Sequence, residues 1–429
     1  MRFWVVLGWG LAFAMLAGCR PDPVAEIKPT AQTLAADSIP PIEIGPDDWP
    51  WWRGPTLDNH ATGPTPPLTW SETENLLWKV KIPGEGHSSP IVVGDKVFVS
   101  YADAARQRKA LLAVDRESGD ILWDTEIHNG GFMTAHAKNS QASSTPVSDG
   151  HQVYVAFMAH GGIQVTAVDF EGELQWQKEA GPFNSQHGYG SSLVLYESTV
   201  IVAGDSSGPG FLAALRRDNG EFVWRVSRPQ SPSYGTPIVA TVAGRPQLLL
   251  SGQGQTRSYN PRTGEVLWYC DGPATTTANT VAFHGDYVFA TGGYPQNGIL
   301  CIQADGSGDV TSTHVKWKSR ERLYVPTPLI HDDKLWAAGD SGIGISFDLE
   351  TGKSSPKKRL GGNFSASPTL SGNHLFVPDE SGSMRVFELG DKFIEIASNK
   401  LSGNGFASPV ICGGRLYWRT STHLYCVGE

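Results

Sequence analysis

Residues 88–123 read SSPIVVGDKVFVSYADAARQRKALLAVDRESGDILW, and this stretch decides the fold. Ser-Ser-Pro opens a short apolar run at 91–93, and residues 96–99 and 111–115 follow as two further strand-like runs. Turn pairs at 94–95 and 118–120 separate these runs from a last one that ends at Trp123. The pattern predicts a four-stranded antiparallel meander. One meander has no second layer to pack on, so the chain needs further copies of it.

The opening of this stretch recurs seven more times along the chain. With Pro90 the openings number eight, spaced by roughly 40 to 56 residues, which is the range of a four-stranded propeller blade. The further openings are 144–146, 191–193, 235–237, 279–281, 326–328, 366–368 and 407–409. The closing phrase around Trp123 returns before Trp176, Trp224 and Trp268, carries an insertion before Trp317, and has lost the Trp around Gly352 and Glu388.

The two ends of the array predict how it closes. Residues 75–82, NLLWKVKI, form a single strand with no opening before it, and they contain Trp78. The eighth opening is followed by only two more strand-like runs, at 415–418 and 423–427. We therefore expect an all-β, eight-bladed propeller over residues 49–429, in which the N-terminal strand completes the last blade and removes the open edges.

Composition excludes some partners. The 429 residues include 49 Gly and 29 Pro, as many tight turns require, and 18% charged residues, which is usual for a globular protein. The formal net charge of −9 repels phosphate backbones, so nucleic acid is not an expected partner.

Residues 1–19 have the pattern of a secretory signal. A basic start and an apolar run too short to span a bilayer precede Leu16-Ala17-Gly18-Cys19. This ending resembles a bacterial lipoprotein signal, which implies lipidation of Cys19; the alternative is an ordinary signal with an unmodified Cys. Arg20 follows, which does not favour retention in the inner membrane. The expected location is the cell envelope, on the outer membrane facing the periplasm.

Residues 20–48 are Pro-rich and lack an apolar period, which predicts a disordered tether. Residues 49–70 begin with WPWWRGP, the densest aromatic cluster in the chain. Two interpretations remain open: a lid packed across the propeller, or a platform that binds a sugar or a peptide.

The phrases LAVDRESGDILW and SYNPRTGEVLW resemble the PQQ-type β-propeller repeat, with its Ala-Xaa-Asp…Thr-Gly…Trp pattern. The resemblance covers nearly all of residues 70–429. Eight blades on a secreted chain of this size resemble the outer-membrane assembly factors of the BamB family, and Trp-Arg-Gly-Pro resembles secreted propellers of Planctomycetes. The quinoprotein alcohol dehydrogenases share the fold but are longer. A WD40 array is disfavoured because the Trp-Asp pair at 123–124 is not repeated.

The resemblance implies that each Trp docks against the neighbouring blade, above a Gly turn that lets it lie flat. The residues expected in this role are Trp78, Trp123, Trp176, Trp224, Trp268 and Trp317, with Gly119, Gly220 and Gly264.

The segments that enter the opening strands should surround the central channel. They supply hydroxyls, amides, two histidines and aromatic rings, and form a funnel that could hold a small polar ligand or a peptide. The candidate binding residues are His87, Ser89, Ser144, His187, Tyr234, Thr236, Asn279, Tyr324, Ser367 and Ser408. The alternative is that small polar residues simply fit a narrow, wet channel.

Catalytic signals are few. The sequence contains no adjacent Cys pair, haem-attachment motif, zinc-protease motif or phosphate loop. The loop histidines show no metal-ligand spacing, and 305–309 lacks most of a calcium loop, so no metal site is expected. The funnel segments hold no Asp and no Glu except Glu85. This lack of carboxylates disfavours a bound calcium ion, and hence a PQQ cofactor.

Four cysteines follow Cys19. Cys412 and Cys426 are expected on the first and third strands of one blade, and Cys270 and Cys301 on the fourth and third strands of adjacent blades. Strands two apart lie roughly 10 Å from each other, too far for a disulfide. Four buried free thiols are therefore expected.

These observations predict a non-catalytic, monomeric, lipid-anchored propeller that acts as a scaffold for other envelope proteins. A PQQ-dependent quinoprotein oxidoreductase is the alternative, and a carbohydrate-binding module is the third hypothesis.

Overall fold

The computed structural model describes residues 22–35 and 39–429. The signal segment 1–19, with the lipidation candidate Cys19, lies outside the described residues. No helix in the described ranges is both long enough and apolar enough to cross a membrane.

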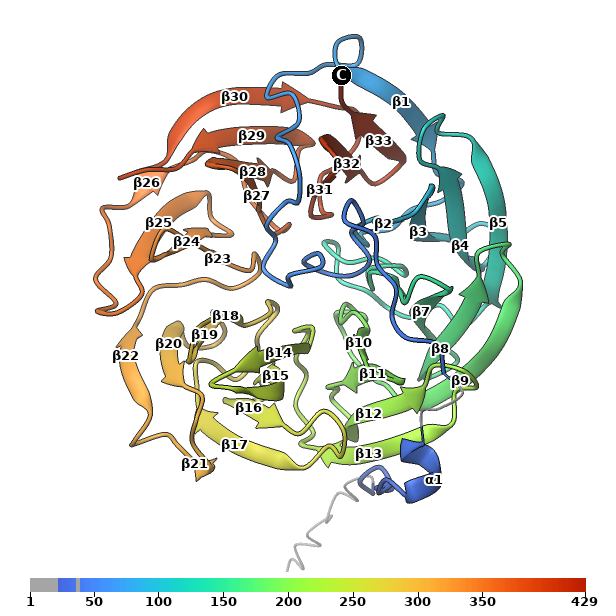
Figure 1. Ribbon diagram of the computed structural model, residues 1–429, viewed down its shortest axis with the longest axis vertical. Helices are drawn as coiled ribbons and strands as arrows, with labels where there is room; N and C mark the ends of the chain where they lie inside the picture. The colour runs from blue at the N-terminus through green and yellow to red at the C-terminus, as the bar shows by residue number, and fades with distance from the viewer. Residues whose placement is uncertain (1–21, 36–38) are drawn as a thin grey trace, which may run out of the picture.

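Eight antiparallel sheets surround a central axis (Figure 1), which confirms the predicted eight-bladed propeller. In each blade the strands run outward in chain order from the innermost one, except that the eighth blade takes its outermost strand from the N-terminal part of the chain. Blades 1 to 4 consist of β2 (Ile91–Val93), β3 (Lys96–Asp103), β4 (Arg108–Asp115) and β5 (Ile121–Asn129); β6 (Val147–Ser148), β7 (Gln152–Ala159), β8 (Gly162–Asp169) and β9 (Leu174–Pro182); β10 (Val194–Tyr196), β11 (Thr199–Gly204), β12 (Gly210–Arg216) and β13 (Phe222–Arg228); and β14 (Ile238–Val242), β15 (Arg245–Gly252), β16 (Gln255–Tyr259) and β17 (Val266–Asp271).

The second half of the chain continues the pattern. Blades 5 to 8 consist of β18 (Ala282–His284), β19 (Tyr287–Gly292), β20 (Gly298–Gln303) and β22 (Val315–Ser319); β23 (Leu329–His331), β24 (Lys334–Ala338), β25 (Ile343–Asp348) and β26 (Lys358–Arg359); β27 (Thr369–Ser371), β28 (His374–Pro378), β29 (Ser383–Glu388) and β30 (Ile394–Lys400); and β31 (Val410–Cys412), β32 (Arg415–Arg419), β33 (His423–Val427) and β1 (Leu76–Lys81). All eight predicted openings directly precede a first strand, so the repeat spacing located every blade.

The ring closes as predicted. Strand β1 pairs antiparallel with β33, with Trp78 opposite Cys426 and Lys79 opposite Tyr425. Residues from the two ends of the chain therefore share the eighth blade (Figure 1). The core is divided among the seams: one cluster joins Val97 and Leu112 of blade 1 to Tyr417 and Leu424 of blade 8.

Five of the six predicted docking tryptophans lie between blades in the same way. Each indole N–H donates to a backbone carbonyl of the next blade, at 2.8–3.1 Å: Trp78 to Arg116, Trp123 to Phe170, Trp176 to Arg217, Trp224 to Pro261 and Trp317 to Leu349. Each ring lies over a turn glycine with positive φ: Gly119, Gly172, Gly220, Gly264 or Gly352. A Cβ on any of these glycines would lie within 2.5–2.8 Å of the ring. Only glycine fits both the turn and the close approach.

Trp268 differs from this pattern. Its indole N–H donates to Gln247 Oε1 of its own blade, at 2.7 Å. The inserted strand β21 (Gly308–Asp309) pairs parallel with β17, opposite Trp268 and Tyr269, and makes blade 4 five-stranded. The insertion before Trp317, visible in the sequence, therefore occupies the place where the next blade's Gly turn lies in the other seams.

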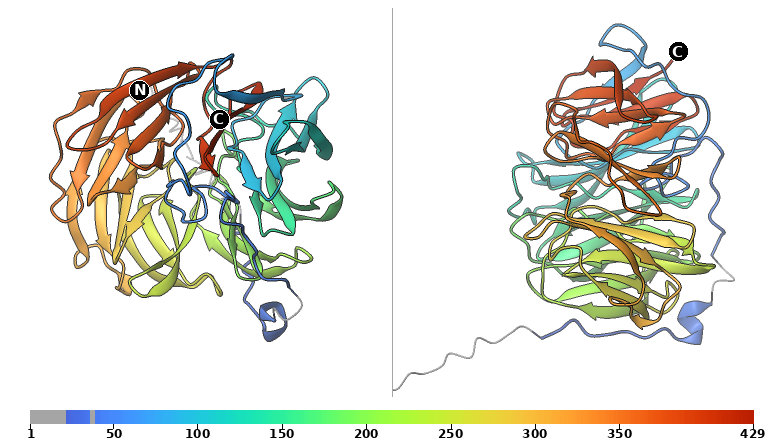
Figure 2. Two further views of the ribbon diagram at one scale, coloured as in Figure 1. Left: turned by 45° about the horizontal axis from the view of Figure 1, so that its top comes forward. Right: turned by 90° about the vertical axis from the view of Figure 1, so that its left-hand side faces the viewer.

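The Pro-rich segment differs from the predicted tether. Residues 22–35 and 39–48, which we call the strap, lie along the outside of the propeller (Figure 2) and include α1 (Ala31–Leu34). Ile27 exchanges two backbone hydrogen bonds with Arg225 of β13, at 2.8 and 2.9 Å. The Glu43 N–H donates to the Asp149 carbonyl at 2.9 Å. These contacts use backbone groups more than apolar side chains, which explains why no hydrophobic period marked the segment.

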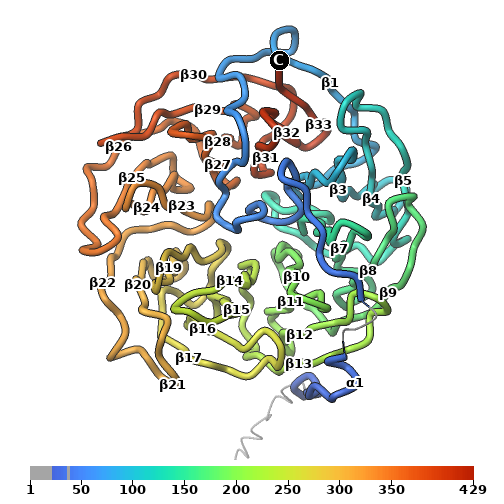
Figure 3. The backbone as a smooth tube through the Cα atoms, in the orientation of Figure 1, coloured from blue at the N-terminus to red at the C-terminus, as the bar shows by residue number. Residues whose placement is uncertain are grey.

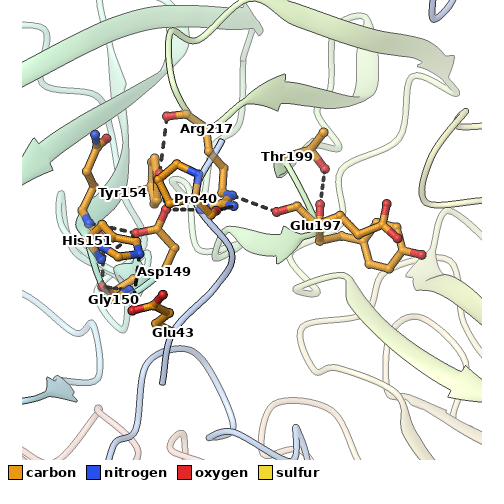
Figure 4. Close-up of polar contacts among 12 residues, drawn as sticks. Pro40, Glu43, Asp149, Gly150, His151, Tyr154, Glu197, Thr199 and Arg217 are labelled. Carbon is orange, nitrogen blue, oxygen red and sulfur yellow. Dashed lines mark hydrogen bonds and ion pairs between the residues drawn. The ribbon is translucent and has the colours of Figure 1, made fainter. Parts of the chain in front are cut away.

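Arg217 binds the strap at the seam between blades 2 and 3 (Figure 4). Its buried guanidinium pairs with the carboxylate of Asp149 and donates to the Glu197 carbonyl at 2.8 Å. It also donates to the carbonyl of Pro40 in the strap at 2.5 Å. A buried guanidinium needs several acceptors, and the strap supplies one of them.

Cys270, Cys301, Cys412 and Cys426 are buried free thiols on the strands predicted for them. Burial raises the pKa of Cys412 and of Cys426 to about 12. Neither thiol ionises near neutral pH, so both behave as apolar core groups.

Candidate functional site: the central channel

Residues 49–70, which we call the lid, cross the centre of the propeller (Figures 1 and 3), and Trp52 of this segment lines the channel. Trp49 is 2% exposed and pairs through its backbone with Val92, and His60 and Thr62 form bridges with Leu370 and Cys412. Trp52 is half-buried and donates its indole N–H to Thr280 Oγ1 at 3.1 Å. The aromatic cluster is thus packed against the propeller as a lid, although the half-buried rings of Trp51 and Trp52 also line a small cavity of about 130 Å³.

Eight hydroxyl side chains, one from each blade, line the narrow part of the channel. We call this set the hydroxyl ring: Ser89, Thr145, Ser192, Thr236, Thr280, Thr327, Ser367 and Ser408. Together with Trp52, His87, Tyr234, Phe406 and several smaller residues they surround a cavity of about 100 Å³. Six of the eight directly precede a proline, and the residue before proline is held extended.

The hydroxyl ring is also a belt of hydrogen bonds between blades. In six seams, the backbone N–H of one member donates to the hydroxyl oxygen of the next at 2.8–3.1 Å. Thr280 differs, because its hydroxyl donates to the Thr236 carbonyl at 3.2 Å and accepts from Trp52. The hydroxyl of Ser89 contacts no described polar group.

Four predicted binding residues belong to the ring: Ser89, Thr236, Ser367 and Ser408. Ser144 and Asn279 do not line the channel, and this part of the prediction was wrong by one residue. Thr145 and Thr280 take their places, because successive side chains of an extended segment point in opposite directions. The Asn279 amide instead donates to Thr291 and to the Leu323 carbonyl. The position just before the proline would have identified six of the eight ring members.

The other end of the channel opens into a wider mouth of about 450 Å³. It is lined by the predicted residues His87, His187, Tyr234 and Tyr324. His136, Lys138 and Asp340 also line the mouth but lie outside the segments that enter the first strands, whereas Phe406 lies within the last of those segments. The Tyr234 hydroxyl lies 3.0 Å from His187 Nδ1, and the His187 ring lies 5.6 Å from that of His136.

The mouth carries two ion pairs. Arg322 pairs with Asp340 at 3.0 Å, and Lys138 pairs with Glu380 at 2.6 Å. Both carboxylates come from turns between the second and third strands of a blade, β24–β25 and β28–β29. The segments entering the first strands hold no Asp and no Glu except Glu85, as the sequence indicates, but these turns bring carboxylates to the mouth from outside those segments.

His87 lies where the mouth meets the hydroxyl ring. Its ring packs on Phe406 with 4.4 Å between centroids, and its Nδ1 is buried without a described partner. Burial and, to a smaller extent, the charge of Arg419 lower the pKa of His87 to about 4. His87 is therefore neutral at physiological pH, and one of its ring nitrogens is free to contact a ligand.

The donor set does not fit a PQQ–calcium centre. Hard cations such as calcium prefer several carboxylate oxygens. Asp340 lines the mouth and is already engaged by Arg322, and Glu380, which does not line the cavity, is engaged by Lys138 of the mouth. Within the described ranges, no three His, Cys, Asp or Glu side chains are grouped as metal ligands.

The closed ring of eight sheets, the Trp–Gly seams and the polar channel define an eight-bladed β-propeller. The model of the family described as outer membrane protein assembly factor BamB matches residues 66–206. Over 257 residues, the chain is 25% identical to BamB of Shewanella oneidensis, covering 54% of this chain and 60% of that protein. The chain therefore carries PQQ-type propeller repeats and resembles BamB.

Dehydrogenases are also similar. A polyvinylalcohol dehydrogenase of a Pseudomonas species is 29% identical over 187 residues, which cover 38% of this chain and 28% of that enzyme. The matches thus span 60% of one curated relative and about a quarter of the other.

Solved structures share the fold at low sequence identity. BamB from Moraxella catarrhalis superposes with a TM-score of 0.60 at 14% identity, covering 82% of this chain and 97% of that one. The quinohemoprotein alcohol dehydrogenase of Comamonas testosteroni gives a TM-score of 0.54 at 12% identity, covering 89% and 81%.

Proposed function

We propose that the protein is a non-catalytic, lipid-anchored scaffold of the bacterial envelope that binds other envelope proteins at the mouth of its channel. The observation that carries this proposal is the asymmetry of the channel. The lid packs across one end, whereas the other end is an open cavity of about 450 Å³. Similarity to BamB, named as an outer membrane protein assembly factor, supports a role in the envelope.

The chemistry of the mouth suits a polypeptide segment. Tyr234, Tyr324, Phe406 and the histidines offer rings, which are enriched at protein interfaces. Arg322 also lies over the Tyr324 ring, 5.3 Å from its centroid. The ion pairs leave the mouth with little net charge, so binding would depend on rings and hydrogen bonds more than on attraction between opposite charges.

Site-specific photo-crosslinking in cells tests this proposal. A photoreactive amino acid at Tyr324 should give discrete adducts with envelope proteins. The matched control is Leu174, 45% exposed on the outer strand β9. Adducts that are absent from both positions, or equally abundant at both, would contradict binding at the mouth.

A quinoprotein oxidoreductase is the second candidate, because polyvinylalcohol dehydrogenase is among the similar proteins. This function ranks lower because the carboxylates at the mouth are engaged in ion pairs with Arg322 and Lys138 and are not grouped to bind calcium.

A further inference from the structure

The hydroxyl ring presents hydrogen-bond donors to the centre of the channel. A serine or threonine hydroxyl has one hydrogen to donate and an oxygen that accepts. Six ring oxygens already accept a backbone N–H from the preceding blade, at 2.8–3.1 Å. None of these six, nor Ser89, donates its own hydrogen to an acceptor in the described part of the chain. Seven O–H groups are therefore left for whatever occupies the cavity.

Ser89 is the clearest of these donors. Its side chain is 4% exposed, it lines the cavity, and its hydroxyl has no partner among the described residues. The adjacent His87 also has a buried ring nitrogen without a partner. Buried polar groups are rarely left unpaired, so these two atoms indicate an occupant of the channel.

Two buried arginines make the surroundings of the ring electropositive. Arg419 is fully buried and donates to the Ser88 hydroxyl at 2.6 Å and to the Ser100 carbonyl at 2.5 Å. Arg53 of the lid is 2% exposed and donates to the carbonyl of Pro328, the residue after Thr327, at 3.4 Å. Neither guanidinium has a carboxylate within ion-pair distance among the described residues.

Both arginines keep their charge at neutral pH. Burial lowers the pKa of Arg419 to about 9, and burial lowers that of Arg53 to about 10 despite the nearby Asp58. A buried charge without a counter-ion is costly. Neither arginine lines the cavity, but each bonds to a sequence neighbour of a ring member, so an anion held by the ring would offset part of that cost.

We propose that the hydroxyl ring binds one small anionic group, either a halide-sized inorganic anion or the carboxylate of a ligand that enters from the mouth. O–H groups that converge on an anion form charge-assisted hydrogen bonds, which are stronger than neutral ones. The cavity of about 100 Å³ admits such a group, and it shares His87, Ser143 and Tyr234 with the open mouth. Trp52 and the lid cover the other end. The inference is independent of protein binding at the mouth.

Calorimetric titration of the full-length protein with sodium bromide and with sodium acetate, at constant ionic strength, tests the proposal. The decisive variant is Ser89→Ala, which removes a hydroxyl that bonds to no described protein group, so it should fold normally. Loss of one charge-assisted hydrogen bond should weaken anion binding about tenfold or more.

Ser144→Ala is the matched control. The Ser144 hydroxyl is also buried without a partner, but it does not line the cavity. Anion affinity should therefore stay at the wild-type value. No binding of either anion to the wild type, or equal weakening by both substitutions, would overturn the proposal.

The two sources of the anionic group are then distinguished. Tighter binding of bromide than of acetate would assign the ring to an inorganic anion. Tighter binding of acetate, together with a peptide whose free C-terminus binds while its amidated form does not, would assign the ring to a ligand carboxylate.

Discussion

At the scale of the residue, Trp224 shows how one side chain joins two blades. It is fully buried, donates to the Pro261 carbonyl at 3.1 Å and lies on Gly264. Trp224→Ala should lower the free energy of unfolding by about 3–5 kcal/mol, because it empties a site that the surrounding sheets cannot fill. Trp268→Ala should cost a similar amount, since Trp268 is equally buried although it bonds within its own blade.

The half-buried Trp51 of the lid provides the comparison for this prediction, and Trp51→Ala should cost less. Chemical denaturation of the three variants and the wild type measures the difference. Equal stability of all four proteins would contradict the role assigned to the seams.

His87 predicts a dependence of stability on pH. Burial, with Arg419, lowers its pKa from 6.5 to about 4 in the folded protein. Between these values the unfolded chain binds the proton and the folded protein does not, so stability falls as the pH falls from 6.5 to 4. The loss could reach about 3 kcal/mol. His87→Phe keeps a ring beside Phe406 and should make the free energy of unfolding less dependent on pH in this range.

Denaturation at closely spaced pH values checks this effect. His128→Phe is a second test, because burial, with Lys109 and His160, lowers the pKa of His128 to about 4 as well. An unchanged acid slope in both variants would refute the explanation.

At the scale of the element, the strap is the clearest departure from the sequence prediction. If it is docked as described, the Ile27 amide, which donates to the Arg225 carbonyl at 2.8 Å, should exchange its hydrogen slowly. The adjacent Lys28 amide, which donates to no described residue, should exchange faster and serves as the internal control. Hydrogen exchange resolved to single amides measures both rates. Equally fast exchange of the two amides would contradict docking of the strap and support the prediction of a disordered tether.

The blades could be predicted from the sequence because each one repeats a similar short sequence pattern. In six blades a hydroxyl residue and a proline precede the first strand, and in most blades a glycine turn and a tryptophan mark the last strand. The spacing of these features therefore located all eight blades. The pairing of β1 with β33 followed from the count of strands. The strap could not be predicted, because it docks through backbone groups and through a distant arginine, Arg217, which carry no local pattern.

The site could be predicted only in part, for a related reason. The repeat spacing locates the segments that enter the first strands. These segments contain four predicted residues that line the mouth: His87, His187, Tyr234 and Tyr324. Asp340 reaches the same mouth from another turn of its blade, and the sequence does not show how far such a turn extends over the channel. Ser144 was chosen in place of Thr145 because both are small hydroxyl residues and only the proline register separates them.

At the scale of the whole molecule, the location depends on Cys19, which lies outside the described residues. If its thiol carries the lipid anchor, Cys19→Ser should move the protein from the detergent fraction to the soluble periplasmic fraction, because no acyl chains would hold it at the membrane. Cell fractionation followed by immunoblotting measures this. Membrane association that is unchanged in the variant would contradict the lipoprotein prediction.

The groups that line the channel also distinguish a scaffold from a quinoprotein. A quinone cofactor in this family requires a calcium ion and a base, and hard cations bind carboxylates far better than hydroxyls. Asp340 of the mouth pairs with Arg322 at 3.0 Å, and nearby Glu380 pairs with Lys138 at 2.6 Å. The narrow part of the channel offers hydroxyls. The protein mixed with PQQ and calcium should therefore reduce no artificial electron acceptor with alcohols or sugars. Dye reduction above a heat-killed control that a chelator abolishes would make the enzyme the better hypothesis.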